Sequence, residues 1–319
     1  MSVAKHGMNA SRFSQAELKV RAIARRRANA QLLCVPWRRF RRAYEEYPRW
    51  QSLALWSRAV IATEGRVPST LLTTLQQFCP GFLEDGATSC RPELLAHRLL
   101  EWVHNQGFRY AKQQGWLDAL TFYGVRHLRS EAAWEYGERC EHEWSTKPPA
   151  SLPTFEKWWR EAMRSELCDG ASCLTVASAI EAYVDWEAFI LWLRPLFATN
   201  SELPPQVVSE LERRCPNNSG FFNSHIRENH ENRSPILRRL ARYGKDRFLS
   251  EAKEAGWLDF LLERVPSHPW RVRIMAYDKH WRKQRPSSRA IAHPSFHQWR
   301  QAAGRYIKTA DEAKQSCRQ

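Results

Sequence analysis

The 319-residue sequence predicts an all-α protein with two tandem homologous multi-helical units, preceded by a basic helical N-terminal arm. The composition favours helices, because 15 Trp supply large buried areas while only 13 Gly leave little room for turn-rich β architectures. Apolar residues recur at helical spacing, and no alternating stretch is long enough to require a sheet. The third observation is an internal repeat.

The repeat appears when the chain is aligned with itself. Residues 43–80 match residues 179–216 at an offset of 136 with thirteen identities, and residues 98–162 match residues 239–303 at an offset of 141 with fifteen more. Chance would give roughly one identity in twenty positions. We therefore divide the chain into an arginine-rich arm (1–42), repeat unit 1 (43–170) and repeat unit 2 (171–319).

The arm and both units are expected to be helical. The arm contains a candidate helix from about Ser14, and each unit shows the same order of elements. Proline at a helix start and glycine just past a helix end mark the boundaries. In chain order we expect a Trp-rich helix (Tyr44 to Thr63; Ala179 to Thr199), a short helix after Pro68 or Pro204, a long amphipathic helix ended by Gly115 or Gly256 (Pro92 to Gln114; Pro235 to Ala255), a short helix opened by Trp-Leu-Asp, and a helix carrying Tyr136 or Tyr277. Each unit then closes on a Pro-x-Phe-x-x-Trp motif, at Pro153 to Trp158 or Pro294 to Trp299.

Tryptophans that recur in both units are interpreted as core residues. Trp116 and Trp257 occupy one repeated position, and Trp158 and Trp299 occupy another. A repeated indole is expected where the same core must be packed twice. Base stacking is the alternative, and we assign it only to the unrepeated Trp270 and Trp281, which have basic neighbours.

The positive charge is distributed unevenly along the chain. The arm carries a net charge of +10, unit 1 carries −3 and unit 2 carries +8, which together give the +15 of the whole chain. A helix that merely keeps a protein soluble would mix both signs, and the arm does not. This distribution predicts a polyanionic partner for the arm and for unit 2.

Three basic sets are the candidate nucleic-acid-binding residues. Guanidinium groups suit phosphate oxygens because they donate paired hydrogen bonds and stay ionised. The second set lies on the side of the Pro235 to Ala255 helix opposite its apolar residues, and the third is interleaved with Trp270, Tyr277 and Trp281. The sets are Arg25, Arg26, Arg27, Arg38, Arg39 and Arg42; Arg238, Arg239, Arg242 and Lys245; and Arg271, Arg273, Lys279, Arg282 and Lys283.

No catalytic, metal or cofactor site is predicted. Gly-rich loops that cradle nucleotide phosphates are missing from the sequence. His268 and Arg271 have the spacing used by tyrosine recombinases, with Tyr306 downstream, but the repeated His127 lacks that spacing, so a structural histidine is favoured. Glu251 and Lys253 resemble half of a nuclease site but fall within a helix. Cys and His pairs are too scattered for a standard zinc site.

We expect a non-enzymatic nucleic-acid-binding protein, with duplex DNA rather than RNA as its ligand. It would act as a regulator or as an accessory factor in recombination or genome maintenance, and the Pro235 to Ala255 helix is the candidate reader of the major groove. The sequence also predicts a cytoplasmic or nucleoid-associated protein without membrane contact. Two alternatives stay open: a helical scaffold whose unit 1 binds a partner protein, and an enzyme whose site is not visible in sequence.

Overall fold

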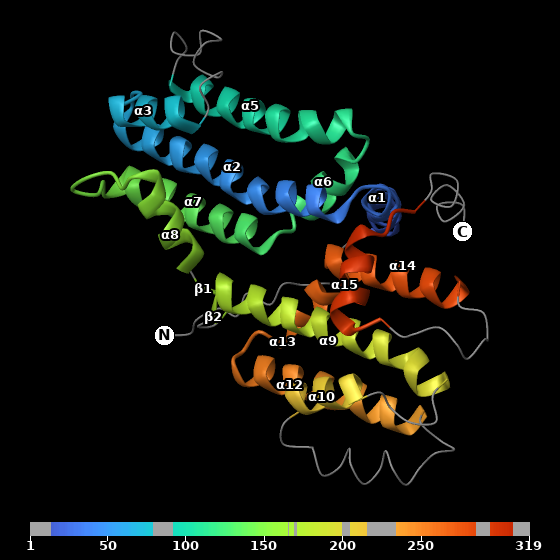
Figure 1. Ribbon diagram of the computed structural model, residues 1–319. Helices are drawn as coiled ribbons and strands as arrows, with labels where there is room; N and C mark the ends of the chain where they lie inside the picture. Colours follow the sequence, from blue (N-terminus) through green and yellow to red (C-terminus); the bar gives the residue numbers. More distant parts are fainter. Residues whose placement is uncertain are drawn as a thin grey trace.

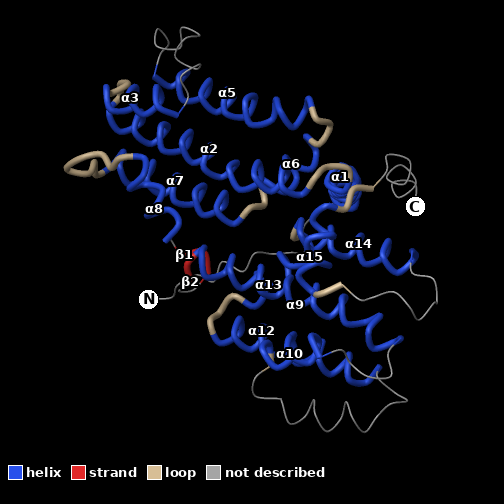
Figure 2. The backbone as a smooth tube through the Cα atoms, viewed as in Figure 1, coloured by secondary structure: helices blue, strands red, loops and turns tan. Residues whose placement is uncertain are grey.

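The computed structural model describes residues 14–78, 92–164, 166–168, 171–199, 205–215, 234–284 and 294–308. Apart from loops and turns, this part of the chain is helical except for one short antiparallel hairpin, formed by β1 (Glu166–Cys168) and β2 (Ala171–Ser172) where the two halves of the molecule join (Figure 2). The predicted all-α class is confirmed.

The first half of the molecule is arranged around the long helix α2. In Figure 1, α2 runs between α5 and α7, and both helices contact it along much of its length. Helix α1 packs against α6 at one end of this group. The helices are α1 (Gln15–Leu33), α2 (Trp37–Glu64), α3 (Ser69–Phe78), α5 (Pro92–Gln113), α6 (Leu117–Gly124), α7 (Leu128–Thr146) and α8 (Phe155–Arg164).

The second half is arranged in the same way around the long helix α9, which contacts α12 and α14. Helix α15 lies against α14, and α14 also contacts α1 of the first half. The elements are α9 (Cys173–Thr199), α10 (Pro205–Arg214), α12 (Ser234–Glu254), α13 (Leu258–Arg264), the short 3₁₀ turn η3 (Val265–Ser267), α14 (Pro269–Gln284) and α15 (Phe296–Arg305).

The arm is part of the folded structure. Helix α1 begins as expected at Ser14, whose hydroxyl accepts a hydrogen bond from the Glu17 amide (3.3 Å) while its own amide donates to the Glu17 carboxylate (2.7 Å). Helix α2 begins at Trp37, directly after Pro36, and not at Tyr44. No helix-breaking residue lies between Trp37 and Tyr44. The expected boundary between residues 42 and 43 therefore falls inside a continuous helix.

The two long amphipathic helices end in the same way. Gly115 and Gly256 adopt positive φ angles of 76° and 82°, which glycine reaches without a steric cost. The backbone then reverses direction, and the amide of the next residue, Trp116 or Trp257, donates to the carbonyl of Ala111 or Ala252 at 2.9 Å. The predicted glycine caps are confirmed.

The recurring tryptophans are core residues, as expected. Trp158 and Trp299 are completely buried, and Trp116 and Trp257 are nearly so. Other contacts also occur twice: the indole N–H of Trp56 donates to the Pro153 carbonyl (3.1 Å), as that of Trp192 does to the Pro294 carbonyl (3.0 Å). One apolar core nevertheless extends across both halves. Paired contacts of this kind are what two copies of one unit would give, and two separate units remain a prediction.

Arg273 connects the arm to the second half of the molecule, and its position corrects the sequence interpretation. Its side chain is completely buried and donates to four carbonyl groups, so it cannot contact a phosphate. No carboxylate of the described residues faces it, and burial lowers its pKa to about 10. The acceptors are the carbonyls of Leu32 (2.8 Å), Val35 (2.8 Å), Ala303 (3.2 Å) and Tyr306.

Replacing Arg273 with Met should lower the free energy of unfolding by about 3–5 kcal/mol, because carbonyl groups at the ends of α1 and α15 would lose their donors while remaining buried. Urea unfolding measures this loss. Arg242→Met, at an exposed position of α12, is the control and should change stability by less than about 0.5 kcal/mol. Similar losses in both variants would mean that Arg273 does not hold the arm in place.

Trp257→Ala should lower the free energy of unfolding by about 3–5 kcal/mol, because the substitution leaves a cavity in the shared core. Denaturant unfolding followed by circular dichroism measures the change. A variant of unchanged stability that fails to bind nucleic acid would instead identify Trp257 as a contact residue.

Candidate functional site

The predicted arm residues have different surroundings. Arg27, Arg38 and Arg39 are exposed, and none forms an ion pair with another described residue. The other three are exposed but engaged within the chain. Arg25 donates to the Pro266 carbonyl (3.1 Å), Arg42 pairs with Glu46 (3.0 Å), and Arg26 makes a contact of its own.

The second predicted set forms a basic stripe on α12, and its described side chains are exposed, as expected. Arg238, Arg242 and Lys245 are all solvent-accessible, while the side chain of Arg239 lies outside the described part. The opposite side of the helix is packed so closely that Gly244 touches the Trp186 indole with no room for a Cβ atom. Figure 1 places α12 at the lower edge of the molecule, away from α1, so the stripe and the arm form separate surfaces.

The third predicted set, on α14, is mostly paired or buried. Arg271 is held by two hydrogen bonds to the Glu187 carboxylate (2.5 and 3.1 Å), and Arg282 pairs with the buried Asp278 (2.7 Å). Only Lys279 and Lys283 are exposed without an ion pair to another described residue. The two unrepeated indoles pack internally, Trp270 against Trp37 and Trp281 against Trp299.

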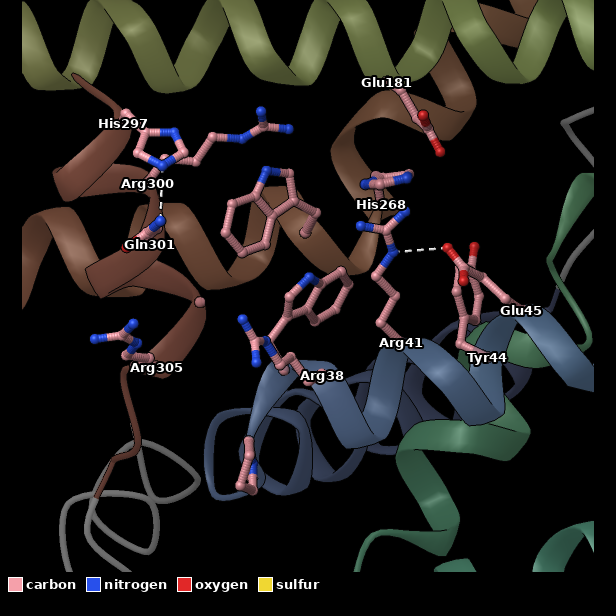
Figure 3. Close-up of a pocket in the computed structure, with 14 residues that line it drawn as sticks. Arg38, Arg41, Tyr44, Glu45, Glu181, His268, His297, Arg300, Gln301 and Arg305 are labelled. Carbon is pink, nitrogen blue, oxygen red and sulfur yellow. Dashed lines mark hydrogen bonds and ion pairs between the residues drawn. The ribbon is translucent and has the colours of Figure 1, made fainter.

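A pocket of about 500 Å³ lies where the start of α2 meets α9, α14 and α15 (Figure 3). Its lining includes four arginines, and two of them already have carboxylate partners: Arg41 pairs with Glu45 (2.7 Å) and Arg300 pairs with Asp185 (3.2 Å). The other two, Arg38 and Arg305, form no ion pair with the described residues.

The pocket is polarised. Figure 3 shows His297, Arg300, Gln301 and Arg305 of α15 on one side, and Glu181 and the paired Glu45 and Arg41 on the opposite side. The indoles of Trp37 and Trp270, with ring centroids 5.2 Å apart, supply an aromatic wall. A pocket that combines apolar walls with a few placed polar groups is typical of a ligand site.

The sequence interpretation missed the arginines of α15. The repeat contains a signal for Arg300 alone, because Arg305 corresponds to Arg164 of unit 1. At the same offset of 141, Arg300 corresponds to Trp159 and Gly304 to the buried Met163 of unit 1. Unit 2 thus has a cation and a glycine where unit 1 has two bulky apolar side chains. A search for differences between the repeats, in addition to their identities, would have identified α15.

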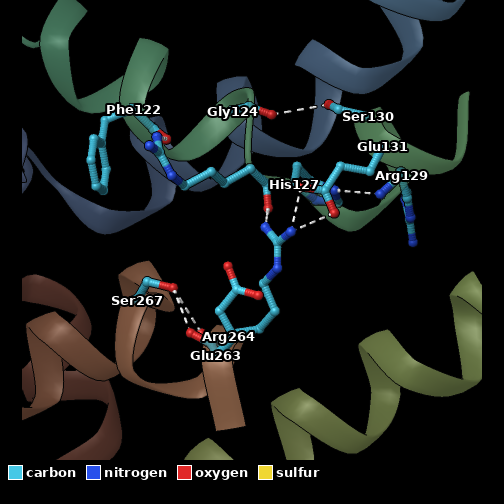
Figure 4. Close-up of polar contacts among 10 residues, drawn as sticks. Phe122, Gly124, His127, Arg129, Ser130, Glu131, Glu263, Arg264 and Ser267 are labelled. Atoms are coloured by element: carbon cyan, nitrogen blue, oxygen red, sulfur yellow. Dashed lines mark hydrogen bonds and ion pairs between the residues drawn. The ribbon is translucent and has the colours of Figure 1, made fainter. Parts of the chain in front are cut away.

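A second polar cluster lies between the two halves of the molecule (Figure 4). The Arg264 guanidinium of α13 donates to both Glu131 oxygens (2.5 and 2.7 Å) and to the Arg126 carbonyl (3.1 Å). His127 caps α7 by accepting from the Arg129 amide (3.1 Å), and its ring lies against that of Tyr44.

Burial keeps both repeated histidines neutral. It lowers the pKa of His127 to about 3, with a smaller effect of the nearby Arg129 charge, and the pKa of His268 to about 4. The recombinase-like residues do not converge on His268, because Arg271 is bound to Glu187 and the Tyr306 ring packs on His280. Both histidines are thus suited to structural roles.

Within the described ranges, no group of three or more His, Cys, Asp or Glu side chains is arranged to hold a metal ion. Among the helices of those ranges, none combines the length and the apolar character that crossing a bilayer requires.

His127→Asn should reduce the acid sensitivity of the protein. In the wild type the stabilisation by neutral His127 is complete above the ordinary pKa of 6.5 and declines as the pH falls from there towards about 3. Asparagine retains a cap acceptor but does not titrate. Melting temperatures measured from about pH 7 to about pH 4.5 should fall less steeply for the variant. The exposed His142→Asn is the control, and identical slopes in all three proteins would contradict the prediction.

Comparison of the chain with protein-family models, with curated proteins and with solved structures gave no significant match. A function for this chain therefore has to follow from the pocket and from the exposed charges described above.

Proposed function

We propose that this protein is a non-enzymatic nucleic-acid-binding protein whose ligand is duplex DNA. The observation that carries the proposal is the corner formed by the last two turns of α1 and the first turn of α2. Arg27, Arg38 and Arg39 are exposed there and form no ion pair with the described residues. Arginines in this state keep their donors available for phosphate oxygens.

The position of this corner supports the proposal. Because Arg273 binds carbonyls at the end of α1 and just before α2, the corner is fixed against α14 and α15. A fixed set of cations loses less conformational entropy on binding than a flexible basic tail does. The surface therefore suits a ligand with regularly spaced phosphates.

The choice of duplex DNA rests on α12. Arg238, Arg242 and Lys245 lie along one exposed side of this 21-residue helix, at spacings of four and three. The major groove of B-form DNA admits a helix, whereas the deep, narrow major groove of A-form RNA does not. A cationic helix face of this length suits the former.

Unit 1 gives a matched comparison, because it has a related sequence and a net charge of −3. If charge and not the shared core determines binding, cations of unit 1 will contribute little to the affinity. This difference allows a control with equal loss of charge.

The double variant Arg27→Ala/Arg39→Ala should bind duplex DNA more weakly and with less dependence on salt. Each lost phosphate contact removes roughly 0.9 from the slope of log affinity against log salt concentration, so the expected decrease is about 1.8. Fluorescence anisotropy with a labelled duplex at several salt concentrations measures the slope. The control Lys147→Ala/Lys157→Ala removes two exposed charges from unit 1 and should leave the slope unchanged.

An equal decrease in both variants would show that only net charge matters and would contradict a defined surface. Wild-type protein that does not bind duplex DNA at low salt would contradict the proposal altogether and would favour the scaffold. Tighter binding to an RNA duplex than to a DNA duplex of the same sequence would contradict the assignment of α12.

A further inference from the structure

The surface of the pocket between α2 and α15 has a cationic, an aromatic and an acidic part. Arg38 and Arg305 provide cations, and these two form no ion pair with the described residues. The indoles of Trp37 and Trp270 line the pocket as well. Glu181 lies on the side opposite Arg305 and likewise forms no ion pair with the described part of the chain.

Cations at one side call for an anionic group on the ligand. The start of α2 adds to this field, because Pro36 provides no side-chain cap and the first amides of a helix have no acceptor within it. Arginine together with a helix start favours a phosphate over a carboxylate, since phosphate offers more acceptor oxygens and more charge.

The aromatic wall calls for a planar or apolar group beside the phosphate. A phosphate ion alone would leave most of the roughly 500 Å³ unfilled. Nucleobases stack on indoles irrespective of base identity, and guanidinium groups can also cover a base. Glu181 could then accept a hydrogen bond from a sugar hydroxyl or from an amino group of the base.

Gly304 determines whether this space is open. A Cβ atom at this position would lie 3.9 Å from atoms of both Trp37 and Trp270, so a longer side chain would extend along the aromatic wall. Unit 1 has Met163 at the corresponding position, where it is buried. The repeated core therefore does not require a glycine at this position. Because Gly304 has no side chain, it leaves room for a ligand.

From this geometry we propose that the pocket binds a single nucleoside 5′-monophosphate unit, with its phosphate at Arg38 and Arg305 and its base against the Trp37–Trp270 wall. The unit is either a free mononucleotide or the 5′-phosphorylated end of a strand. The inference deepens the proposed function by adding a site for one nucleotide beside the duplex-binding corner. It uses residues other than Arg27 and Arg39, so the two proposals can fail separately.

Isothermal titration calorimetry of the full chain with adenosine 5′-monophosphate tests the proposal. The monophosphate should bind at least about tenfold more tightly than either adenosine or inorganic phosphate, because each of those fills only part of the pocket. Equal affinity for adenosine would contradict a phosphate site. Equal affinity for inorganic phosphate would contradict the stacked base, and no binding at about 1 mM would contradict the site as a whole.

Two substitutions at Gly304 locate the ligand without removing a charge. Gly304→Leu should weaken binding of adenosine 5′-monophosphate by about tenfold or more, and Gly304→Ala by less than about threefold, because only leucine extends over the indoles. Neither should lower the melting temperature, since both residues favour a helix more than glycine does. Wild-type affinity in a folded Gly304→Leu protein would overturn the assignment.

Arg305→Ala provides an independent variant at an exposed side chain. It should weaken binding of the monophosphate by about fivefold or more and leave adenosine binding unchanged. Equal losses for the two ligands would contradict a phosphate at Arg305.

Competition separates the two sources of the nucleotide. A 5′-phosphorylated tetranucleotide that displaces the monophosphate, while its unphosphorylated form does not, identifies a strand end; no displacement by either identifies the free nucleotide. Gly304→Leu should keep the wild-type salt slope on duplex DNA, and Arg27→Ala/Arg39→Ala should keep the wild-type affinity for the monophosphate. A lost salt effect alone would therefore remove only the proposed function, and a lost monophosphate site alone would remove only this inference.

Discussion

The arrangement of this protein depends on one buried guanidinium. Within the part of the chain that the structure describes, Arg273 has no carboxylate partner and instead donates to carbonyl groups near the ends of α1 and α15. The last carbonyls of a helix have no intrahelical donor, so a buried junction of two helix ends is stable only if another group satisfies them. Arg273 does so for both ends at once. The corresponding residue of unit 1 is Ala132, which cannot donate, and so only unit 2 can hold the arm in this way.

The pocket is a consequence of that junction. Because the corner between α1 and α2 packs against α14 and α15, Trp37 contacts Trp270, and Arg38 and Arg305 line the same pocket. These residues come from distant parts of the chain. The two halves share paired contacts, such as the indole hydrogen bonds of Trp56 and Trp192, and they differ in the Arg273 junction, which lies in the second half.

Many of the exposed cations are already neutralised within the chain. Arg42, Arg271 and Arg282 each pair with a carboxylate, so a polyanion would meet fewer available cations than the 49 Lys and Arg of the sequence. Among the described residues, exposed cations that form no such pair include Arg27 and Arg39 at the α1–α2 corner, Arg38 and Arg305 at the pocket, and Arg242 and Lys245 on α12. These three places define where ligand contacts are proposed.

By itself the sequence determined the helical class, most helix boundaries and the identity of the core tryptophans. Each of these depends on local periodicity, on Pro and Gly at helix ends, or on repetition at a fixed offset, and all three can be read along one chain. The Gly115 and Gly256 caps and the burial of Trp158 and Trp299 are examples.

Only the tertiary structure decided which arginines are free. Arg273 and Arg271 lie in the same basic run as Lys279. Arg273 is nevertheless buried and donates to carbonyl groups, whereas Arg271 is bound to a carboxylate 84 residues away. The pocket likewise joins residues about 260 positions apart, because the distance along a chain does not limit which helix ends meet in a packed core.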